Sequence, residues 1–260
     1  MRASLIITTF NRPDALNLVL KSVNSQSKKP DEIIIADDGS DNVTKTCIEN
    51  FKKTSSIRVE HSWQEDKGFR VAKSRNKAIA KSNFDYIILI DGDVILHNKF
   101  IEDHLKHAKR GFFVQGTRVM LNKSATKRML LKSTSVSFFL SGLKNRKNAI
   151  YSNFLCNIFK NEKNFINNIK TCNFSFYKSD CLSVNGFNNN IEGWGREDSE
   201  FVVRLFNKGI NRKNIRFNMI QYHLWHQLSS REILEKNTLI LEKAINDRIE
   251  WCDNGINQFL

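Results

Sequence analysis

Residues 192–200 read EGWGREDSE, which places an indole between two glycines directly before a cluster of acidic residues. Glycine adopts backbone conformations that other residues avoid, so the pair allows a tight loop around Trp194. Glu197 and Asp198 stand where a helix is predicted to begin, and the N-terminal end of a helix dipole favours ionised carboxylates. The alternative is a capped helix start beside a buried tryptophan, with no part in chemistry.

A second acidic pair, Asp91 and Asp93, lies in a DGD sequence that directly follows an apolar run. Two carboxylates separated by one residue leave an extended strand on the same side, and Gly92 allows the backbone to approach a ligand closely. Such a pair can hold a hard divalent cation that also binds phosphate oxygens. An ordinary polar turn after a strand is the alternative.

The sequence YHLWH at 222–226 places His223 and His226 three residues apart. Imidazoles suit manganese or zinc, although a lone pair with this spacing is more often part of the core or the surface. The two histidines are nevertheless candidate metal ligands, because a cation bound to the DGD carboxylates needs further ligands and no other ligand residue stands near DGD in the sequence.

Two further polar clusters, TTFNR at 8–12 and ADDGSD at 36–41, also follow apolar runs. A carboxylate in ADDGSD can accept a hydrogen bond from the imide N–H of uracil, and TTFNR offers hydroxyls and an aromatic ring for a nucleoside. The alternative for TTFNR is a simple strand-end turn. The alternative for ADDGSD is a helix N-cap by Ser40 or Asp41, which is compatible with ligand binding because different residues are used.

Residues 64–79, QEDKGFRVAKSRNKAI, carry several cations near a glycine and a predicted helix start. These cations are Lys67, Arg70, Lys73 and Arg75. Backbone N–H groups and cations in this setting favour phosphate. The glycine spacing fits neither a Walker loop nor a G-x-G-x-x-G fingerprint.

The elements that must position these clusters alternate between strands and helices along the first 120 residues. Strands are predicted at 4–10, 31–41, 56–61, 86–96 and 111–120, and helices at 13–26, 43–53, 70–82 and 98–110. This alternation predicts an α/β fold with a mostly parallel central sheet flanked by helices. Ligands of such sheets bind beyond the carboxyl ends of the strands, where TTFNR, ADDGSD and DGD all fall.

Four more elements are predicted in the second half of the chain. They are a strand at 172–177, a helix at 197–207, a strand ending within 220–226 and an amphipathic helix at 230–251. No repeat or linker-like stretch separates them, so we expect one domain with a helical C-terminal extension.

The chain has 260 residues and a formal net charge of +14, which favours an anionic partner such as a nucleotide, a nucleic acid or an acidic membrane. Residues 104–161 contain twelve Lys and Arg and no acid, and within them 127–147 interleaves cations with apolar and aromatic residues. This stretch is either a solvated pair of basic helices or a surface for an anionic membrane or acceptor.

Five scattered cysteines without a C-x-x-C pair indicate buried thiols in a reducing compartment. The first residues lack the apolar stretch of a signal peptide, and no segment approaches the length of a membrane span. We therefore expect a cytoplasmic protein with at most peripheral contact at the inner face of the cytoplasmic membrane.

In their order along the chain, these motifs resemble those of bacterial family-two glycosyltransferases, which are inverting, metal-dependent enzymes of the GT-A fold. The C-terminal part is similar to the galactosyltransferase and chondroitin-polymerase type, with G-W-G-x-E-D as the most specific motif. The resemblance covers about residues 3–228. It implies a GT-A domain at 1–228, divided into a nucleotide-binding half at 1–120 and an acceptor-binding half at 121–228, followed by a helical extension at 229–260.

The resemblance also implies roles on the donor side of the site. A nucleoside pocket would be lined by Thr8, Phe10 and Arg12, and Asp38 would bind uracil. Asp91 would contact the ribose or the metal shell. Mn²⁺ or Mg²⁺ would be held by Asp93 with His226 and His223, and Lys67 and Arg75 are the candidates for phosphate contacts.

On the acceptor side, Trp194 would pack against the donor diphosphate and the acceptor sugar. Asp198 would be the catalytic base, and Glu197 would orient an acceptor hydroxyl. Two positions depart from the related sequences, which often carry an acid where Asn188 stands and a small residue where Arg196 stands. These departures bear on the identity of the acceptor more than on the reaction.

The implied function is transfer of a hexose or N-acetylhexosamine from a UDP-sugar to a hydroxyl of a bacterial surface glycan, such as lipooligosaccharide or capsule. One direct displacement would give a β-linkage. The alternatives are a nucleotidyltransferase on a similar fold and a basic nucleic-acid-binding protein; the resemblance implies no nucleic acid partner and leaves the oligomeric state open.

Overall fold

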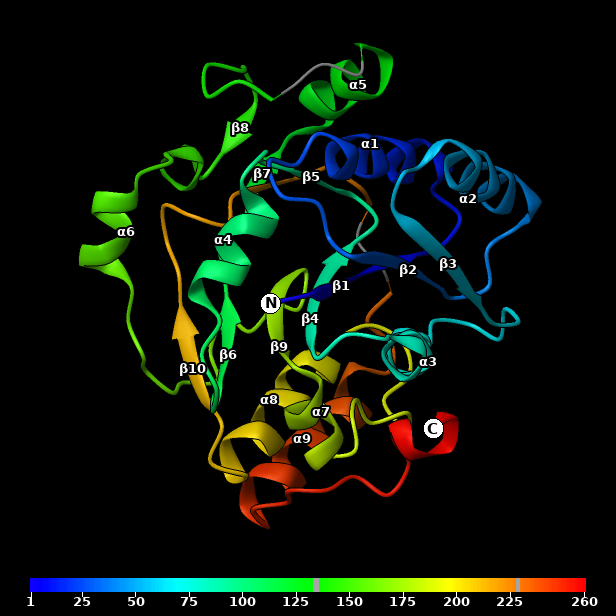
Figure 1. Cartoon of the computed structure of the whole chain (residues 1–260). Coiled ribbons are helices and arrows are strands. Elements are labelled where there is room, and N and C mark those ends of the chain that lie inside the picture. Colours follow the sequence, from blue (N-terminus) through cyan, green and yellow to red (C-terminus); the bar gives the residue numbers. More distant parts are fainter. Residues whose placement is uncertain (133–135, 228–229) are drawn as a thin grey trace.

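A seven-stranded sheet forms the centre of the molecule, with the strand order β10-β6-β9-β4-β1-β2-β3 (Figure 1). The structure is a computed structural model, and it describes residues 1–132, 136–227 and 230–260. The strands are β1 (Ala3–Thr9), β2 (Glu32–Asp37), β3 (Arg58–Trp63), β4 (Tyr86–Asp91), β6 (Phe112–Gln115), β9 (Asn173–Tyr177) and β10 (Asn211–Asn214). All neighbours are parallel except β9, which is antiparallel to both β4 and β6. The predicted mostly parallel sheet is confirmed.

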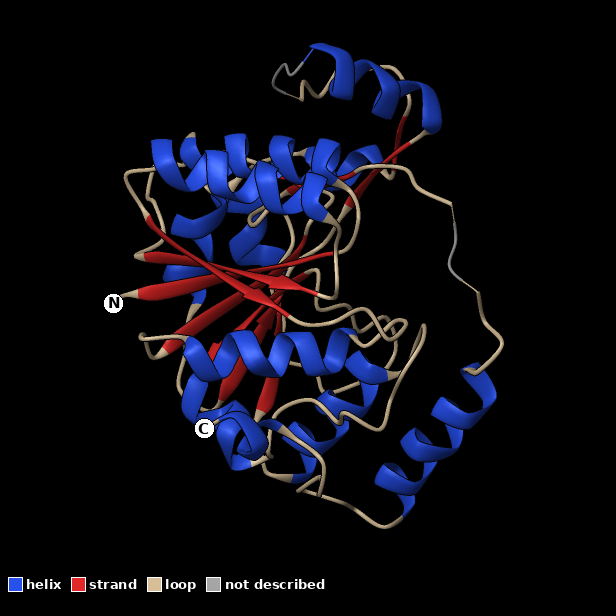
Figure 2. Ribbon diagram, turned by 90° about the vertical axis from the view of Figure 1, so that its right-hand side faces the viewer, coloured by secondary structure: helices blue, strands red, loops and turns tan. Residues whose placement is uncertain are grey.

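Helices cover both faces of this sheet and produce three layers (Figure 2). The helices are α1 (Pro13–Asn24), α2 (Asn42–Thr54), α3 (Val71–Lys81), α4 (Phe100–His107), α5 (Lys123–Lys132), α6 (Asn153–Phe159), α7 (Lys178–Ser183), α8 (Glu197–Asn207) and α9 (Leu234–Asn246), with the short 3₁₀ turns η1 (Arg146–Ala149) and η2 (Ile256–Phe259). Because side chains alternate along a strand, Leu5 and Ile7 of β1 pack toward α1 and α4, whereas Ile6 packs toward α3 and α8. A sheet with both faces buried explains why its central strands are almost wholly apolar.

A second sheet of four short strands crosses one end of the first. It has the order β5-β11-β7-β8, formed by β5 (Val94–Leu96), β11 (Gln221–His223), β7 (Val119–Leu121) and β8 (Leu143–Lys144). The single strands predicted at 86–96 and 111–120 are therefore wrong, because each is divided between the two sheets. At the first break, the Gly92 N–H donates to the carbonyl of Thr8, and a Cβ at this position would lie 2.7 Å from that oxygen. Only glycine permits this close approach, which turns the chain just before Asp93.

Two other predicted elements differ from the structure. The helix predicted at 230–251 is the shorter α9, because Arg248 adopts a φ of 51° and ends the helical path. The basic stretch 127–147 is not a helix pair: α5 ends at Lys132, and Gly142, with a φ of 96°, leads into β8. Residues 133–135 of this stretch and the expected domain boundary at 228–229 lie outside the described residues.

Several local predictions hold. Pro13 opens α1, and the Asp41 side chain accepts from the backbone N–H groups of Val43 and Thr44 as the N-cap of α2. All five cysteines are free thiols, and four of them are buried. Over the described ranges, no helix is both long and apolar enough to cross a bilayer.

Candidate active site

The carboxyl ends of β1 and β4 bring two of the sequence motifs into contact. Their parallel register sets Thr8 opposite Asp91, and the Thr8 hydroxyl donates to the Asp91 carboxylate at 2.9 Å. TTFNR and DGD therefore meet at one edge of the sheet, as the position of ligand sites in such sheets requires.

The second sheet brings YHLWH to Asp93. In the antiparallel pairing of β5 with β11, His223 lies opposite Val94, and the Leu224 N–H donates to the Asp93 carbonyl at 2.9 Å. The Nε2 atoms of His223 and His226 each lie 3.5 Å from an Asp93 carboxylate oxygen. One potential ligand atom from each of the three residues falls within 4.8 Å of the others.

The hydrogen bonds of this cluster suit a metal ion. His223 Nδ1 lies 2.8 Å from the Leu224 carbonyl, and His226 Nδ1 lies 2.7 Å from the Gln227 carbonyl. Because a carbonyl only accepts, Nδ1 is the donor in both contacts, so a neutral imidazole at either position would direct the lone pair of Nε2 toward Asp93. A cation between these lone pairs and the carboxylate would turn a repulsive arrangement into an attractive one.

The carboxylate of Asp93 supports the same interpretation. Its side chain is only 13% exposed, and Oδ1 is buried without a hydrogen-bond partner in the described part of the chain. Burial raises the pKa of Asp93, against the opposing effect of the nearby imidazoles and Arg12. Arg12 donates to Oδ2 at 3.0 Å, so the structure places it beside the metal candidates, and its contact with a nucleoside stays a prediction.

Arg75 of α3 joins the two acidic pairs. This buried guanidinium donates to Asp198 at 3.0 Å, to Glu197 at 3.4 Å and to Asp91 at 3.4 Å. Its partners are thus carboxylates, and the phosphate contact expected for Arg75 stays a prediction. The arrangement holds the DGD and G-W-G-x-E-D motifs together across the sheet.

Asp198 is also fixed by the segment that precedes β9. Thr171 donates to its carboxylate from the backbone N–H at 3.0 Å and from the hydroxyl at 2.6 Å. With these bonds and Arg75, the carboxylate keeps one orientation at the first turn of α8, where the helix dipole also favours negative charge. Such a carboxylate can accept a proton from a hydroxyl placed beside it.

Glu197 lies in a different electrostatic setting. Burial and the neighbouring Asp198 carboxylate raise the pKa of Glu197 to about 8, against the opposing effect of Arg75. At neutral pH the Glu197 carboxyl is therefore largely protonated and can donate a hydrogen bond. The two adjacent acids thus divide into a proton acceptor and a hydrogen-bond donor.

The Gly-Trp-Gly loop is held from outside by α9. Asn237, which is fully buried, donates to the carbonyls of Glu192 and Gly195 at 2.8 and 3.0 Å. Gly193 and Gly195 adopt φ angles of 66° and 101°, a conformation that favours glycine, and a Cβ at either would meet the side-chain end of Ile233 or Leu234. Trp194, in contrast, is 38% exposed and available to a ligand.

The two departures from the related sequences have structural partners. Arg196 adopts a φ of 80°, a conformation that favours glycine, and its Nε donates to Thr238 of α9 at 3.1 Å. Asn188 is buried and donates to Glu200, which in turn pairs with the buried Arg204.

The remaining predicted donor residues lie around the end of β2. Asp38 is buried and accepts from the Gln64 side chain and the Arg70 N–H, both at 2.6 Å, and burial raises its pKa. Phe10 is 45% exposed beyond β1. Lys67 is exposed and pairs with Glu65 at 3.0 Å, so its contact with phosphate stays a prediction.

Sequence reasoning missed Thr171 and Asn237. Thr171 belongs to no motif and reaches Asp198 only through the fold. Asn237 had a detectable signal, because it occupies the same helical face as the buried Leu241 and Ala244, where a polar residue needs an explanation.

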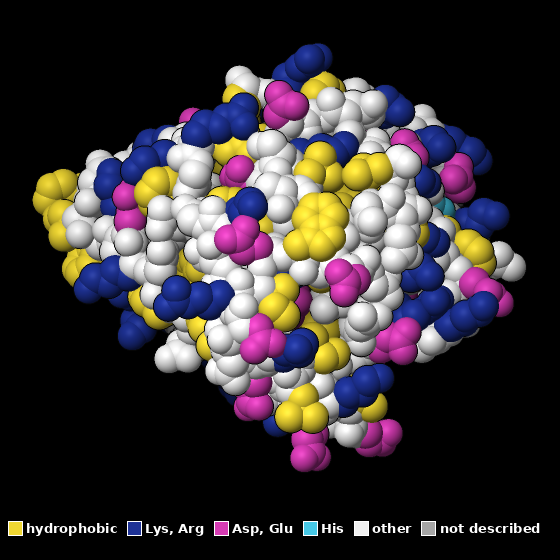
Figure 3. Space-filling view, turned by 90° about the horizontal axis from the view of Figure 1, so that it is seen from below, with side chains coloured by type: hydrophobic (Ala, Val, Ile, Leu, Met, Phe, Trp, Pro, Cys, Tyr) yellow, Lys and Arg dark blue, Asp and Glu magenta, His cyan; other side chains and the backbone are white. Residues whose placement is uncertain are grey.

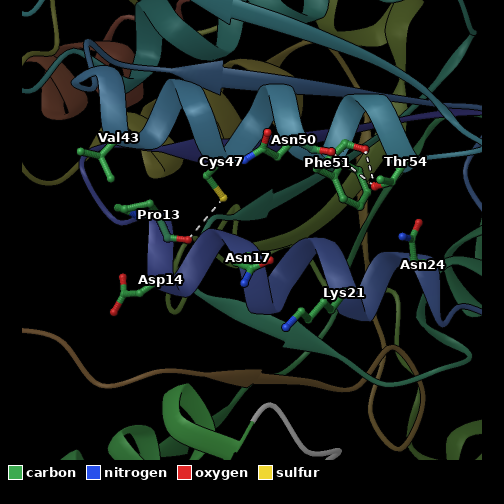
Figure 4. A pocket seen from close by; sticks show the side chains of 10 residues that line it. All are labelled: Pro13, Asp14, Asn17, Lys21, Asn24, Val43, Cys47, Asn50, Phe51 and Thr54. Atoms are coloured by element: carbon green, nitrogen blue, oxygen red, sulfur yellow. Dashed lines mark hydrogen bonds between the residues drawn. The ribbon is translucent and has the colours of Figure 1, made fainter.

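A groove of about 600 Å³ lies elsewhere, between α1 and α2 (Figure 4). Residues of both helices line it, from Pro13 and Val43 at one end to Asn24 and Thr54 at the other. None of the predicted site residues is among them, so the groove is separate from the acidic and histidine clusters.

The raised pKa of Glu197 predicts a pH-dependent contribution to stability. Since the folded protein keeps this proton up to about pH 8 and the unfolded chain loses it near the ordinary value of 4.5, the contribution is lost as pH rises through this window. Urea denaturation of the wild type and Glu197→Gln at pH 5, 6, 7 and 8 should therefore show the wild type losing stability relative to the variant as pH rises. A difference that does not vary with pH would contradict the assigned protonation.

Two protein-family models match this chain. The model described as "Glycosyl transferase family 2" matches residues 4–179, and that described as "N-terminal domain of galactosyltransferase" matches residues 153–227. The chain is 24% identical to the chondroitin synthase of Pasteurella multocida over 79% of its own length and 22% identical to that of Escherichia coli over 85%. It spans 23% and 34% of the length of these two relatives.

Solved structures of Staphylococcus aureus TarS share the architecture. The chain aligns over its whole length with TarS at a TM-score of 0.66 and with TarS 1–349 in complex with UDP-GlcNAc at 0.63, covering 41% and 69% of those chains. At 14% identity this likeness shows the fold alone, which confirms the predicted GT-A type. The family 2 match covers more than half of the sequence, from β1 past the end of β9, and the chain therefore belongs to glycosyl transferase family 2.

Proposed function

We propose that this glycosyltransferase moves a hexose or N-acetylhexosamine from a UDP-sugar to a hydroxyl of a bacterial surface glycan, with inversion and with the aid of a divalent cation. The observation that carries the proposal is that three residues able to hold a metal ion and a fixed carboxylate, Asp198, meet at the DGD motif, where Arg75 donates to both Asp198 and Asp91. Transfer from a nucleotide-sugar needs both functions, one at the leaving diphosphate and one at the attacking hydroxyl.

The metal would be held by Asp93, His223 and His226. When bound, Mn²⁺ or Mg²⁺ would supply positive charge to the departing diphosphate. The mixed carboxylate and imidazole ligands favour Mn²⁺ over Mg²⁺, since Mg²⁺ prefers oxygen. Arg12, already at Asp93, adds a fixed positive charge on the same side.

The acceptor hydroxyl would lose its proton to Asp198 as its oxygen attacks the anomeric carbon. Thr171 and Arg75 hold the carboxylate for this step, and protonated Glu197 can donate to an oxygen of the acceptor or donor sugar. A single displacement of this kind inverts an α-linked donor to a β-linked product. The exposed face of Trp194 offers a surface on which a sugar ring can stack.

The donor would lie at the ends of β1, β2 and β4. Thr8, Phe10 and Arg12 would surround the nucleoside, Asp38 would bind the uracil and Asp91 the ribose, with Lys67 and Arg75 as the phosphate candidates. The TarS complex with UDP-GlcNAc supports a UDP-sugar donor on this fold. Relatives named as chondroitin synthases, and a Campylobacter jejuni glucosyltransferase named for an undecaprenol-linked glycan, support a capsule-type or lipid-linked glycan as the acceptor.

We also propose peripheral contact with the inner face of the cytoplasmic membrane. Exposed apolar side chains, among them Phe139, Phe154 and Ile158, accompany the cations of the acid-free stretch 104–161. Hydrophobic side chains gather beside Lys and Arg at the left-hand edge of Figure 3, the side on which α6 lies in Figure 1. Cations beside apolar residues are the combination that binds an anionic bilayer surface.

The first test of the function is UDP release from a panel of UDP-sugars without acceptor. Release with one sugar, lost on adding EDTA and restored by Mn²⁺, is the expected result. His226→Gln should weaken Mn²⁺ binding, measured by electron paramagnetic resonance, about tenfold or more, because a metal ligand is removed. His97→Gln, outside the cluster, is the matched control, and equal Mn²⁺ affinity in the two variants would refute the ligand assignment.

Replacement of the proposed base gives the second test. Asp198→Asn keeps the shape of the side chain but removes the proton acceptor, so the transfer rate should fall by roughly 10²–10⁴ while UDP affinity is kept. Asp247→Asn, on the exposed end of α9, is the control. Loss of UDP binding together with transfer would show that Asp198 supports the fold or the donor site rather than the chemistry.

The membrane proposal is tested by sedimentation with vesicles. The wild type should pellet with phosphatidylglycerol vesicles and not with phosphatidylcholine vesicles, and Phe139→Ser with Phe154→Ser should reduce pelleting severalfold. Leu239→Ser removes an apolar residue of similar exposure from α9 and should have no effect. Pelleting that does not respond to anionic lipid would reject the contact.

A further inference from the structure

A second pocket lies at the same edge of the sheet, on the side of β9 away from the donor motifs. Its volume is about 370 Å³, and its walls come from the ends of β6 and β10, the segment just before β9, and the region of η1. β4, β1 and β2, which carry the donor motifs, lie on the other side of β9 in the strand order. The pocket therefore lies across β9 from the donor motifs, and Asp93, His223 and His226 are not among its lining residues.

The lining is cationic. Four of the lining residues carry positive charge, and none is acidic: the cations are Arg118, Lys170, Arg212 and Arg216. None of the four forms an ion pair with any residue that the structure describes, which is unusual for cations drawn around one small cavity. The remaining lining is rich in asparagine, whose amides can bind sugar hydroxyls.

Arg212 is the most deeply buried of these four cations. It is 3% exposed, its Nη1 donates to the carbonyls of Phe165 and Asn167, and its Nε is buried without a partner in the described ranges. Burial lowers the pKa of Arg212 to about 10, and burial with the nearby Arg118 and Arg212 lowers that of Lys170. A buried cation without a counter-ion is destabilising, and an anionic ligand would remove that penalty.

The pocket is connected to the proposed catalytic base through three consecutive residues. Lys170 and Cys172 line the pocket, and Thr171 between them holds Asp198 by two hydrogen bonds. A ligand seated here therefore lies against the segment that positions Asp198. This places it where the acceptor, rather than the donor, would be found.

We propose that this pocket binds a negatively charged group, a carboxylate or a phosphate, carried by the acceptor glycan. The inference rests on the proposed transferase function, which it deepens by naming the acceptor as an acidic glycan. A volume of this size accommodates a single sugar unit with its charged substituent. Arg118 and Lys170, which are only partly buried, would make the adjustable contacts, and Arg212 would supply fixed charge.

The test uses the full chain saturated with UDP and Mn²⁺, so that the donor site is occupied. Two pairs of probes are titrated by nuclear magnetic resonance: methyl β-glucuronide against methyl β-glucoside, and glycerol 3-phosphate against glycerol. We expect at least one charged probe to bind about tenfold more tightly than its neutral partner. Arg118→Gln and Lys170→Gln should each weaken that binding about fivefold or more, and added salt should weaken it further.

Lys52→Gln, which removes the same charge from an exposed position on α2, is the matched control and should bind as the wild type does. Preference for the glucuronide or for the phosphate identifies the charged group, and similar binding of both supports a general anion site. Equal binding of charged and neutral probes, no binding of either charged probe, or binding that Arg118→Gln and Lys170→Gln leave unchanged would overturn the proposal.

Acceptor-independent UDP release separates this proposal from the function itself. Arg118→Gln and Lys170→Gln should keep the thermal unfolding temperature of the wild type, which shows that both variants are folded. If the wild type releases UDP from no sugar and the charged probes still bind in the pocket, the proposed donor chemistry fails while the anion site stands. If UDP is released normally and the charged probes do not bind, only the anion site fails.

Discussion

The guanidinium of Arg75 is the interaction on which the rest of the site depends. Asp91 lies more than one hundred residues before the adjacent Glu197 and Asp198, and the carboxylates of Asp91 and Asp198 would repel each other if brought together alone. A buried arginine at their centre offsets that repulsion, and its several N–H donors fix the direction of each carboxylate. The DGD and G-W-G-x-E-D motifs therefore share one charge centre.

The second sheet brings the YHLWH segment, which is distant in sequence, to Asp93. Because the chain leaves the main sheet at Gly92, Asp93 stands at the start of a new strand, and that strand pairs with β11. Antiparallel pairing sets His223 opposite Val94, directly after Asp93, and His226 follows three residues beyond the end of the strand. Strand pairing, which is more rigid than a loop, thus fixes the position of His223 beside Asp93.

Much of this could be predicted from the sequence, and the failures have physical causes. The strands, helices and acidic motifs were evident because apolar runs and polar strand ends follow simple periodicities, and α8 was predicted with its observed bounds. The division of 86–96 and 111–120 between two sheets was not, since an apolar run does not reveal which partner it pairs with. Arg75 was predicted as a phosphate ligand because its carboxylate partners are distant in sequence. Thr171 could not be predicted for the same reason. Nor could the pocket that gathers Arg118, Lys170, Arg212 and Arg216 from three separate segments.

The contact between α9 and the Gly-Trp-Gly loop has a consequence for how such enzymes diversify. Asn237 binds only main-chain carbonyls, those of Glu192 and Gly195, and makes no demand on the side chain between them. The loop can therefore keep its shape while the residue it presents changes. Selection for a new acceptor could therefore replace Trp194 without removing the two hydrogen bonds that hold the loop. The C-terminal helix fixes the backbone of the loop and leaves the identity of its exposed side chain open to change.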